Sequence, residues 1–262
     1  MLKINSELCI HCGLCSKHCV GGLISMNQDN QPLVAANFEQ ACFKCGQCAA
    51  VCPKSAIAFS ENDVADWENV DISEQANLLQ FSSLVKNRRS IRHYQEKLIP
   101  QAVILELLDI ARYAPTGGNA QSVKWLVVGG KDKLRDLSAL CIDWFVSKKI
   151  LPASVRTDFE NGNDIVHRGA PHLLIAYAEN QETTPADDCV IALRTVELAA
   201  QAADLGSCWA GFFKWAANNH QPIAQLLKLP DNHSIHGALM LGYPKYKYIK
   251  IPVRKAAEVT FL

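Results

Sequence analysis

The sequence predicts an α+β protein, in which a central sheet is covered by helices, preceded by a small cysteine-rich N-terminal domain. Eight of the eleven cysteines lie within the first 52 residues, so composition sets the N-terminal part apart. Beyond residue 75, helical patterns of apolar residues outnumber extended ones, and the two kinds are interspersed. About half of the 262 residues are apolar, which is enough to bury a sizeable core.

Charge and N-terminal composition narrow the class of protein. The formal net charge is zero, so no bulk field favours nucleic acid or an acidic membrane surface. The sequence has no apolar run of transmembrane length, and its N-terminus lacks the apolar core of a secretory signal. We therefore expect a cytoplasmic protein that binds neither nucleic acid nor membrane. In a reducing compartment, a dense cysteine cluster indicates metal binding rather than disulfides.

The N-terminal cysteines form two runs of identical spacing, C-x2-C-x2-C-x3-C. The first run is Cys9, Cys12, Cys15 and Cys19, and the second is Cys42, Cys45, Cys48 and Cys52. A glycine follows the second cysteine of each run and lets the backbone wrap closely around a bound group. The repeat predicts a domain of two similar halves, each with a short strand, a ligand loop and a turn of helix.

This spacing is typical of [4Fe–4S] clusters, and the fourth cysteine of such a run ligates the other cluster. We therefore assign one cluster to Cys9, Cys12, Cys15 and Cys52, and the other to Cys19, Cys42, Cys45 and Cys48. The alternatives are zinc, which favours two C-x2-C pairs separated by a longer finger, and a disulfide framework. Residues 1–60 resemble the bacterial two-cluster ferredoxins, although Val20 rather than proline follows Cys19. The resemblance implies that this domain carries electrons.

The next segments connect this domain to a larger one. Residues 61–79 are expected to form a linker and the start of a helix, because 60–75 are polar and acidic and Asp71 and Glu74 have capping-box spacing. That helix would end near Asn87. Pro100 then opens an amphipathic helix that is expected to run to Pro115.

Four apolar segments predict the strands of the larger domain, at residues 125–128, 173–178, 207–213 and 237–242. Helices are expected at 188–205, where Gly206 stops an alanine-rich stretch, and at 221–228. The helix at 188–205 is apolar or small on nearly every face, as expected for a helix buried on several sides. Burial inside one subunit and burial in a dimer interface both fit this pattern.

Three polar segments are candidates for binding a cofactor. The run Arg88-Arg89-Ser90-Ile91-Arg92 places three guanidiniums where forked hydrogen bonds to a phosphate can form, although alone it also fits a solvated basic face. The turn at 115–121 holds two amides that can bind a ligand or merely stabilise the turn. The stretch at 245–255 has five basic residues and no acid, and it also fits a soluble tail.

In order and spacing, these segments resemble the nitroreductase family of FMN flavoproteins over about residues 80–262. The family's R-[RH]-S-x-[RK] run corresponds to 88–92, and its A-P-[ST]-x-x-N-x-Q turn corresponds to 114–121. A stretch beside the isoalloxazine ring corresponds to 205–211. The resemblance implies a nitroreductase-like central antiparallel or mixed sheet, bound FMN, and a homodimer whose flavins sit at the subunit interface.

The same resemblance implies roles for the basic residues. Arg88 or Arg89, with Ser90 and the late residue Arg254, would neutralise the FMN phosphate. Arg92 would lie near the ribityl chain or the N1–C2=O edge. A positive charge there stabilises the anionic reduced flavin and makes the flavin readier to accept electrons.

Further site residues follow from the other two segments. The turn would contribute Pro115, Thr116, Asn119 and Gln121, and the backbone of Ala210 and Gly211 would approach the ring. The family often has Pro-Trp after the glutamine, whereas this chain has Ser122-Val123-Lys124-Trp125. Cys208 is interpreted as a small core residue, with a reactive thiol as the alternative. No residue is identified as a catalytic acid or base.

The leading functional hypothesis is an FMN-dependent oxidoreductase in which electrons enter at two [4Fe–4S] clusters, pass to FMN and reach an organic acceptor. Clusters carry one electron at a time, whereas a flavin accepts one or two. The donor would be a reduced ferredoxin or another low-potential source, and the acceptor a nitro compound, a quinone or a similar small molecule. The alternatives are an electron-transfer relay subunit, or an enzyme of the same fold that dehalogenates aromatics or transforms flavin or azoline rings.

Overall fold

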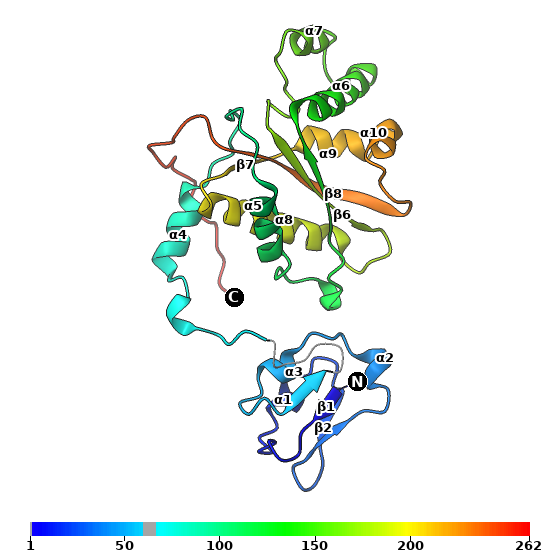
Figure 1. The fold of residues 1–262 in the computed structure, drawn as a ribbon, viewed down its shortest axis with the longest axis vertical. Helices are drawn as coiled ribbons and strands as arrows, with labels where there is room; N and C mark the ends of the chain where they lie inside the picture. The colour runs from blue at the N-terminus through cyan, green and yellow to red at the C-terminus, as the bar shows by residue number, and fades with distance from the viewer. Residues whose placement is uncertain (1, 60–66) are drawn as a thin grey trace. The chain divides into compact units, whose positions relative to one another are not determined.

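The computed structural model describes residues 2–59 and 67–262 and shows two compact units (Figure 1). The first unit comprises Met1–Gln75 with Gly118–Ala120, and the second comprises Ala76–Gly117 with Gln121–Leu262. Each unit has its own buried hydrophobic residues. The expected linker at 60–75 falls partly outside the described residues.

The first unit contains two short antiparallel strand pairs. β1 (Leu2–Ile4) pairs with β4 (Ile57–Phe59), and β2 (Ile24–Met26) pairs with β3 (Pro32–Val34). Its helices include α1 (Leu14–His18), α2 (Phe38–Ala41) and α3 (Gln47–Ala50). Because β1 pairs with β4, the two ends of the cysteine-rich segment are joined.

The backbone of the first unit repeats as its sequence does. α1 and α3 each begin after a glycine in the left-handed region, Gly13 at φ 72° and Gly46 at φ 73°, a conformation that glycine adopts without a Cβ penalty. Two more equivalent pairs share left-handed φ values: His11 (57°) with Lys44 (50°), and Gly22 (63°) with Ser55 (47°). The two halves therefore have matching loop conformations.

Few apolar side chains are available to hold this unit together. Its buried core consists of Leu2, Leu23, Ile24, Phe38, Cys48, Ala49 and Ile57. Four further cysteines, Cys15, Cys19, Cys42 and Cys52, pack against this core and are partly buried. A domain of this size rarely folds on so small a core without a metal group or disulfides. The packing of cysteines into the core therefore favours a bound inorganic group as part of the fold.

The second unit is organised around a four-stranded sheet in the order β5-β6-β8-β7, and every neighbouring pair is antiparallel. The strands are β5 (Lys124–Gly129), β6 (His172–Glu179), β7 (Gly206–Trp209) and β8 (His233–Gly242). β6 and β8 lie in the middle and are buried along most of their length. The predicted α+β architecture with an antiparallel or mixed sheet is confirmed.

Helices cover both faces of this sheet (Figure 1). Successive residues of β6 pack in different layers. Leu173 and Ile175 pack in a core with α6 (Lys131–Ser147) and α9 (Gly211–Ala217). Leu174 and Ala176 pack in a core with α5 (Gln101–Ala111) and α8 (Pro185–Ala202). This alternation follows from the two-residue period of a strand. The shorter helices α7 (Ser154–Glu160) and α10 (Gln221–Leu226) join the layer of α6 and α9.

The helix expected after the linker begins later than predicted. Asp71 caps only a short 3-10 turn at Ile72–Glu74. α4 (Leu78–Asn87) begins instead at a capping box formed by Asn77 and Gln80, in which each side chain accepts a hydrogen bond from the backbone of the other residue. The end of α4 at Asn87 agrees with the prediction.

The structure differs from the sequence-based expectations at one strand and at two helices. The strand expected at 207–213 ends at Trp209, because α9 begins at Gly211. The sequence patterns do not predict α6 or α7, and the first turns of α6 are rich in charged residues.

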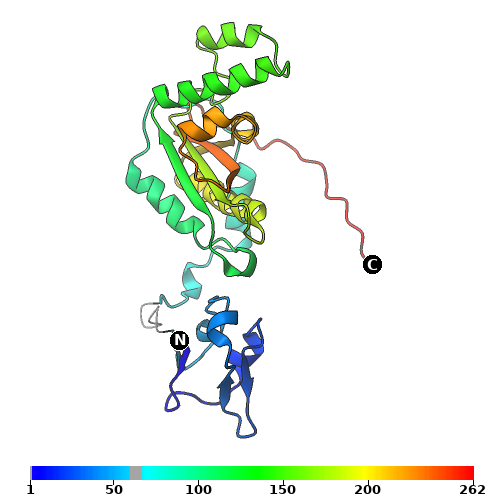
Figure 2. The same cartoon turned by 90° about the vertical axis from the view of Figure 1, so that its right-hand side faces the viewer.

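In the part of the chain that the structure describes, no helix is long and apolar enough to span a bilayer. Residues 245–262 form no regular element and are exposed, and Figure 2 shows their end leaving the second unit.

Candidate functional site

Four cysteines of the first unit line one cavity, which we name chamber A. They are Cys9, Cys12, Cys15 and Cys52. Three of these come from the first cysteine run, whereas Cys52 is the last cysteine of the second run. The rest of the wall is mostly aliphatic, with His11 and Lys54 as its polar members.

A second cavity, chamber B, is lined by the other four cysteines of the repeat. They are Cys19, Cys42, Cys45 and Cys48. Three aromatic side chains contribute to its wall, namely Phe38, Phe43 and Phe59. The last cysteine of each run thus lies with the first three of the other run, as crossed ligation requires. Ligation itself stays a prediction.

The thiols of each chamber are close enough to influence one another's ionisation. Burial raises the pKa of Cys48 to about 11, and the neighbouring Cys19 and Cys45 contribute in the same direction. Burial also raises the pKa of Cys15, with a smaller contribution from Cys12. Within the described residues, no three metal-binding side chains converge where a single ion could be held. Burial and the neighbouring sulfurs thus disfavour the thiolate form, and a bound cationic group, such as the irons of a cluster, would stabilise it.

Backbone N–H groups donate to sulfur at equivalent places in the two halves. The Leu23 N–H donates to Cys19 Sγ with a nitrogen–sulfur distance of 3.2 Å, and the Ala56 N–H donates to Cys52 Sγ at 3.3 Å. Hydrogen bonds of this kind stabilise the thiolate form. In donor set and sulfur hydrogen bonding, the two chambers therefore fit two [4Fe–4S] clusters.

In the second unit, the arginine run lies directly beside β7. A parallel bridge joins Ser90 to Ser207, and the Ile91 N–H donates to the Ser207 carbonyl at 2.9 Å. A Cβ on Gly206 would lie 2.6 Å from the Ile91 side chain, so the approach requires glycine at this position. The fold thus brings the predicted phosphate-binding run against the predicted ring-side stretch at 205–211.

Ala210 and Gly211, at the end of that stretch, have different surroundings. Ala210 is buried and its N–H donates to the Ala238 carbonyl at 2.9 Å. Gly211 is exposed, and a Cβ added to it would meet no atom within 4 Å. Open space therefore lies beside the Gly211 backbone, as a ring placed against it would require.

Arg88 forms an ion pair with a buried glutamate. Its side chain is largely buried and pairs with Glu197 of α8 at 3.0 Å, and Arg194 binds the other oxygen of the same carboxylate. The Arg88 Nε–H is buried without a partner among the described residues. Removing one member of a buried pair strands the other charge, so Arg88 supports the fold. Its predicted place at a phosphate stays a prediction.

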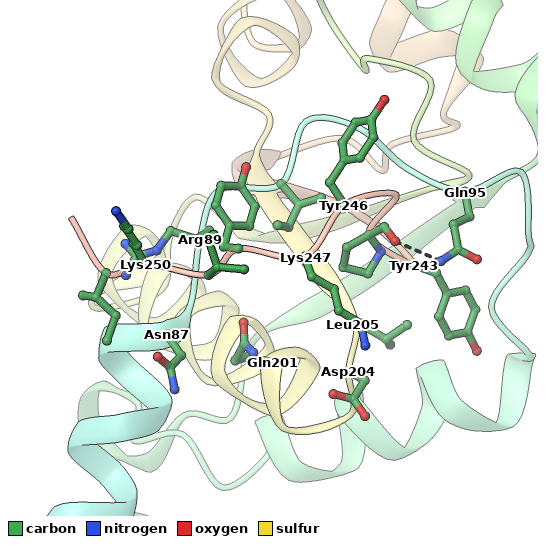
Figure 3. A pocket seen from close by; sticks show the side chains of 15 residues that line it. Asn87, Arg89, Gln95, Gln201, Asp204, Leu205, Tyr243, Tyr246, Lys247 and Lys250 are labelled. Carbon is green, nitrogen blue, oxygen red and sulfur yellow. Dashed lines mark hydrogen bonds between the residues drawn. The ribbon is translucent and has the colours of Figure 1, made fainter.

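Arg89 borders a cleft beside the end of α8 and the C-terminal segment, which we name the C-terminal cleft (Figure 3). Two lysines of the late basic stretch, Lys247 and Lys250, line the same cleft, and Asp204 is its acidic member. The fold thus unites part of the arginine run with part of the C-terminal stretch. Arg254 does not line this cleft and is exposed.

Arg92 lines a second cleft of about 450 Å³, which we name the basic cleft. Lys131 and Arg135 of α6 and Arg168 from the loop before β6 line it as well. Lys131 pairs with Glu96 at 2.5 Å, and Arg135 lies over an aromatic ring. Asp164 is the acidic residue of the cleft wall. Among the described residues, no carboxylate pairs with Arg92 or Arg168, so both guanidiniums can bind an anion.

Arg92 and Arg168 both lie close to the ring-side stretch. Burial raises the pKa of Cys208, and the charges of these two guanidiniums partly oppose that effect. The buried Cys208 thiol therefore stays protonated, which supports its interpretation as a core residue. No sequence pattern marks Arg168. Its position depends on a tight turn in which Arg168 and Gly169 both have left-handed φ, at 56° and 67°.

The turn at 115–121 is anchored to the start of α8. The Gly117 N–H donates to Asp188 Oδ1 at 3.0 Å, and the Thr184 hydroxyl donates to the same oxygen at 2.9 Å. Within the turn, the Gln121 N–H donates to the Thr116 hydroxyl at 3.0 Å. Asp188 is buried, and sequence reasoning missed it because no local motif distinguishes it.

The turn and the arginine run attach to different ends of α8. Asp188 lies near the start of this helix and Glu197 near its end, about 13 Å apart along the axis. Pro115, the first residue of the turn, belongs to the second unit, whereas Asn119 belongs to the first. The role of Asn119 at the flavin stays a prediction.

Comparisons with known proteins agree with both resemblances. Residues 85–243 match the model of the nitroreductase family, and residues 8–57 match that of the 4Fe-4S dicluster domain. A protein of Archaeoglobus fulgidus carries the provisional name NADH dehydrogenase/NAD(P)H nitroreductase. It is 28% identical over 162 residues, which cover 62% of this chain and 84% of that protein.

Solved structures show the same fold. A nitroreductase with bound FMN from Bacteroides fragilis has a TM-score of 0.61 and 25% identity, covering 71% of this chain and 100% of that one. Another with bound FMN, from Desulfitobacterium hafniense, has a TM-score of 0.58 at 20% identity, covering 69% and 97%. Because the family model spans more than half of the sequence, the chain belongs to the nitroreductase family.

Proposed function

We propose that this protein is an FMN-dependent oxidoreductase, which takes electrons through two [4Fe–4S] clusters and delivers them by way of FMN to a small organic acceptor. One observation carries the proposal: a single chain combines two crossed cysteine chambers with a nitroreductase-family unit. The names of its relatives, which mention NAD(P)H nitroreductase and bound FMN, support the flavin and the class of reaction.

The basic cleft fits the polar edge of a flavin ring. Arg92 and Arg168 place two positive charges near the ring-side stretch. There they would stabilise the negative charge of the reduced flavin. The open space at Gly211 leaves room for the ring. When bound, FMN supplies both one-electron and two-electron chemistry.

The phosphate would be held on the other side of the arginine run. Arg89, Lys247 and Lys250 offer three cations in the C-terminal cleft, and guanidinium forks bind phosphate strongly. Arg88 neutralises Glu197, so this buried carboxylate does not oppose an anion bound at the neighbouring Arg89. Ser90 and Arg254 complete the proposed phosphate site.

The cysteine chambers would supply the one-electron carriers. In each, four cysteines would hold the irons as thiolates, and a backbone N–H group would stabilise one of the sulfurs. One-electron carriers suit a donor such as a reduced ferredoxin, and the acceptor would be a nitro compound, a quinone or a similar molecule. A pyridine nucleotide is the alternative donor, since the relatives' names include NAD(P)H.

We further propose a homodimer in which each flavin is completed by both chains. The turn at 115–121 and the arginine run attach to opposite ends of α8, and in the proposed twofold dimer the turn of one chain would complete the site at the run of the other. Val190 and Ile191 of α8 are each 41% exposed, as an unpaired interface would leave them. Light scattering at several dilutions should give a dimer mass, more persistent with FMN than without it. A monomer that keeps its flavin would contradict this assembly.

The proposed function is tested on anaerobically purified protein. It should contain about eight irons, eight sulfides and one FMN per chain. Turnover of a nitroaromatic compound and of a quinone is then measured with reduced ferredoxin and, separately, with NADH and NADPH. Turnover with ferredoxin that is lost in Cys48→Ser supports the proposed path. Stoichiometric zinc, FAD in place of FMN, or full cofactor content without turnover of any acceptor would contradict the proposal, the last result favouring a relay subunit.

A further inference from the structure

Chambers A and B occupy equivalent places in the repeat, but their walls differ in charge. Lys54 lines chamber A and Gly21 lines chamber B. Each of these residues stands two positions after the last cysteine of its run, so they are structural counterparts. A cationic side chain therefore borders chamber A where chamber B has no side chain at all.

The remaining polar wall residues do not cancel this difference. Each chamber has one histidine, His11 in A and His18 in B. Apart from His18, the side chains of the chamber B wall are uncharged, and three of them are the aromatic rings of Phe38, Phe43 and Phe59. Chamber B is therefore the more aromatic of the two, and its wall has no counterpart of Lys54.

One contact acts in the opposite direction. The Lys44 N–H donates to Cys42 Sγ at 3.3 Å, which adds a hydrogen bond to a sulfur of chamber B. Lys44 does not line that chamber, although it is the counterpart of His11. Lys44 carries the same charge as Lys54, but only Lys54 lines a chamber. Because the interaction of two charges weakens with distance, the Lys54 effect should dominate.

Reduction of a cluster adds one electron to a group that four thiolates already make negative. A nearby cation stabilises the more negative form, whereas an apolar wall disfavours it. The surroundings of a cluster thus set its reduction potential. The electron comes from an external one-electron reductant, and no bond or proton changes place in this step.

We propose that Lys54 sets the two clusters at different reduction potentials, so that the cluster of chamber A is reduced first. The proposal rests on the proposed function, because it requires one cluster in each chamber. It adds an order of electron uptake and names the residue that determines this order.

The test is a reductive titration of the anaerobically purified full chain, followed by electron paramagnetic resonance. Wild-type protein should take up its first two cluster electrons in two steps that differ at least tenfold in equilibrium constant, which is about 59 mV for one electron. Lys54→Gln should lower the potential of the first step and leave the second unchanged. Lys3→Gln is the matched control, because Lys3 is exposed on β1 and lines neither chamber.

A reciprocal variant makes the test independent of damage at one site. Gly21→Lys should raise the potential of the second step. The fold tolerates this change, because a Cβ on Gly21 would meet only the Leu23 side chain at 3.4 Å and Gly21 lies outside the left-handed region. Lys44→Gln should move the steps less than Lys54→Gln does.

The outcomes separate this inference from the proposed function. About eight irons per chain, with potentials that neither Lys54→Gln nor Gly21→Lys shifts, would overturn the role of Lys54 alone. Two steps of equal potential in the wild type would do the same. Stoichiometric zinc with little iron would overturn the clusters and this inference together.

Discussion

Cys52 lies in the same chamber as Cys9, although the two residues belong to different cysteine runs. Cys19 lies in the same way with Cys42. Neither chamber is complete until both halves of the repeat have folded, so metal binding and formation of the first unit should be coupled. The sets of cysteines also determine which variants should lose the same cluster.

Pairs of cysteine substitutions test the crossing. Cys19→Ser combined with Cys48→Ser should remove one cluster and leave about four irons per chain, because both residues line chamber B. Cys19→Ser combined with Cys15→Ser should remove both clusters, because the two residues line different chambers. Iron and sulfide analysis measures both. The reverse ranking would show that each run binds its own cluster.

Substitution of Arg168 tests whether the basic cleft holds the flavin. Arg168→Ala should weaken FMN binding by about 1.5–3 kcal/mol if the guanidinium makes a charge-assisted hydrogen bond to it. It should also lower the flavin potential, because the reduced flavin loses a positive neighbour. Arg92→Ala should act in the same direction. Calorimetric titration of the FMN-free protein and spectroelectrochemistry measure these effects.

Arg156→Ala is the control for that experiment. Arg156 is an exposed arginine of α7 that pairs with Asp143 at 2.5 Å, and it does not line the basic cleft. FMN affinity should therefore stay at the wild-type value. If the Arg168 and Arg156 variants bound FMN equally well, the flavin would have to lie elsewhere.

Local patterns predict the parts of the site whose chemistry is local. The spacing of the cysteine runs is enough to group Cys52 with Cys9, because the ligand loops of a cluster are short and regular. Asp188 and Arg168 carry no such pattern. Asp188 matters because it meets Gly117, 71 residues away in the sequence, and Arg168 matters because a turn carries it towards Arg92. Packing of the second unit creates both relationships, so sequence patterns could not predict them.

The same distinction explains which helices are predictable. The end of α4 at Asn87 follows from an apolar pattern that stops before the arginine run. α6 begins with a mixture of lysine, aspartate and arginine, so its helical period is weak over the first turns. Its buried residues, among them Leu137 and Phe145, become recognisable as one face only when the sheet is in place.

Asp188 should hold the turn at 115–121. Asp188→Ala removes the acceptor for Gly117 and Thr184, and hydrogen bonds to a charged group contribute about 1.5–3 kcal/mol each. The free energy of unfolding should therefore fall by at least one such increment, and FMN occupancy should fall with it. Asp188→Asn keeps an acceptor oxygen and should lose less. Urea unfolding followed by circular dichroism measures the difference.

The neighbouring Asp187 provides the control for this prediction. It is exposed in the same turn of α8, and Asp187→Asn should change the free energy of unfolding little, as surface substitutions usually do. Equal losses in the Asp187 and Asp188 variants would mean that the turn is held by other contacts.

His167 should make stability depend on pH. It is fully buried, and its Nδ1 lies 2.7 Å from Ser138 Oγ, which donates to Asp164 at 2.8 Å. Since the serine gives its one proton to the carboxylate, it accepts from Nδ1–H, and the ring is neutral. Burial lowers the pKa of His167 to about 4, while Asp164 opposes the effect.

The sign of this dependence follows from the two states. The unfolded chain, with a histidine pKa of about 6.5, binds the proton first as the pH falls. The free energy of unfolding should thus be highest above that value and should drop by on the order of 3 kcal/mol towards pH 4. Urea unfolding at pH 7 and at pH 5 measures the drop, which should be smaller in His167→Gln. An equally steep profile in that variant would assign the dependence to another group.

The electron path from the cysteine chambers to the flavin is tested most directly by anaerobic stopped-flow mixing with reduced ferredoxin. Oxidised wild-type protein should show cluster reduction no later than flavin reduction, with freeze-quenched samples reporting the clusters and absorbance reporting the flavin. In Cys48→Ser protein that retains its FMN, the flavin should be reduced much more slowly, because a one-electron carrier is lost. Flavin reduction at the wild-type rate in this variant would contradict the path through the clusters.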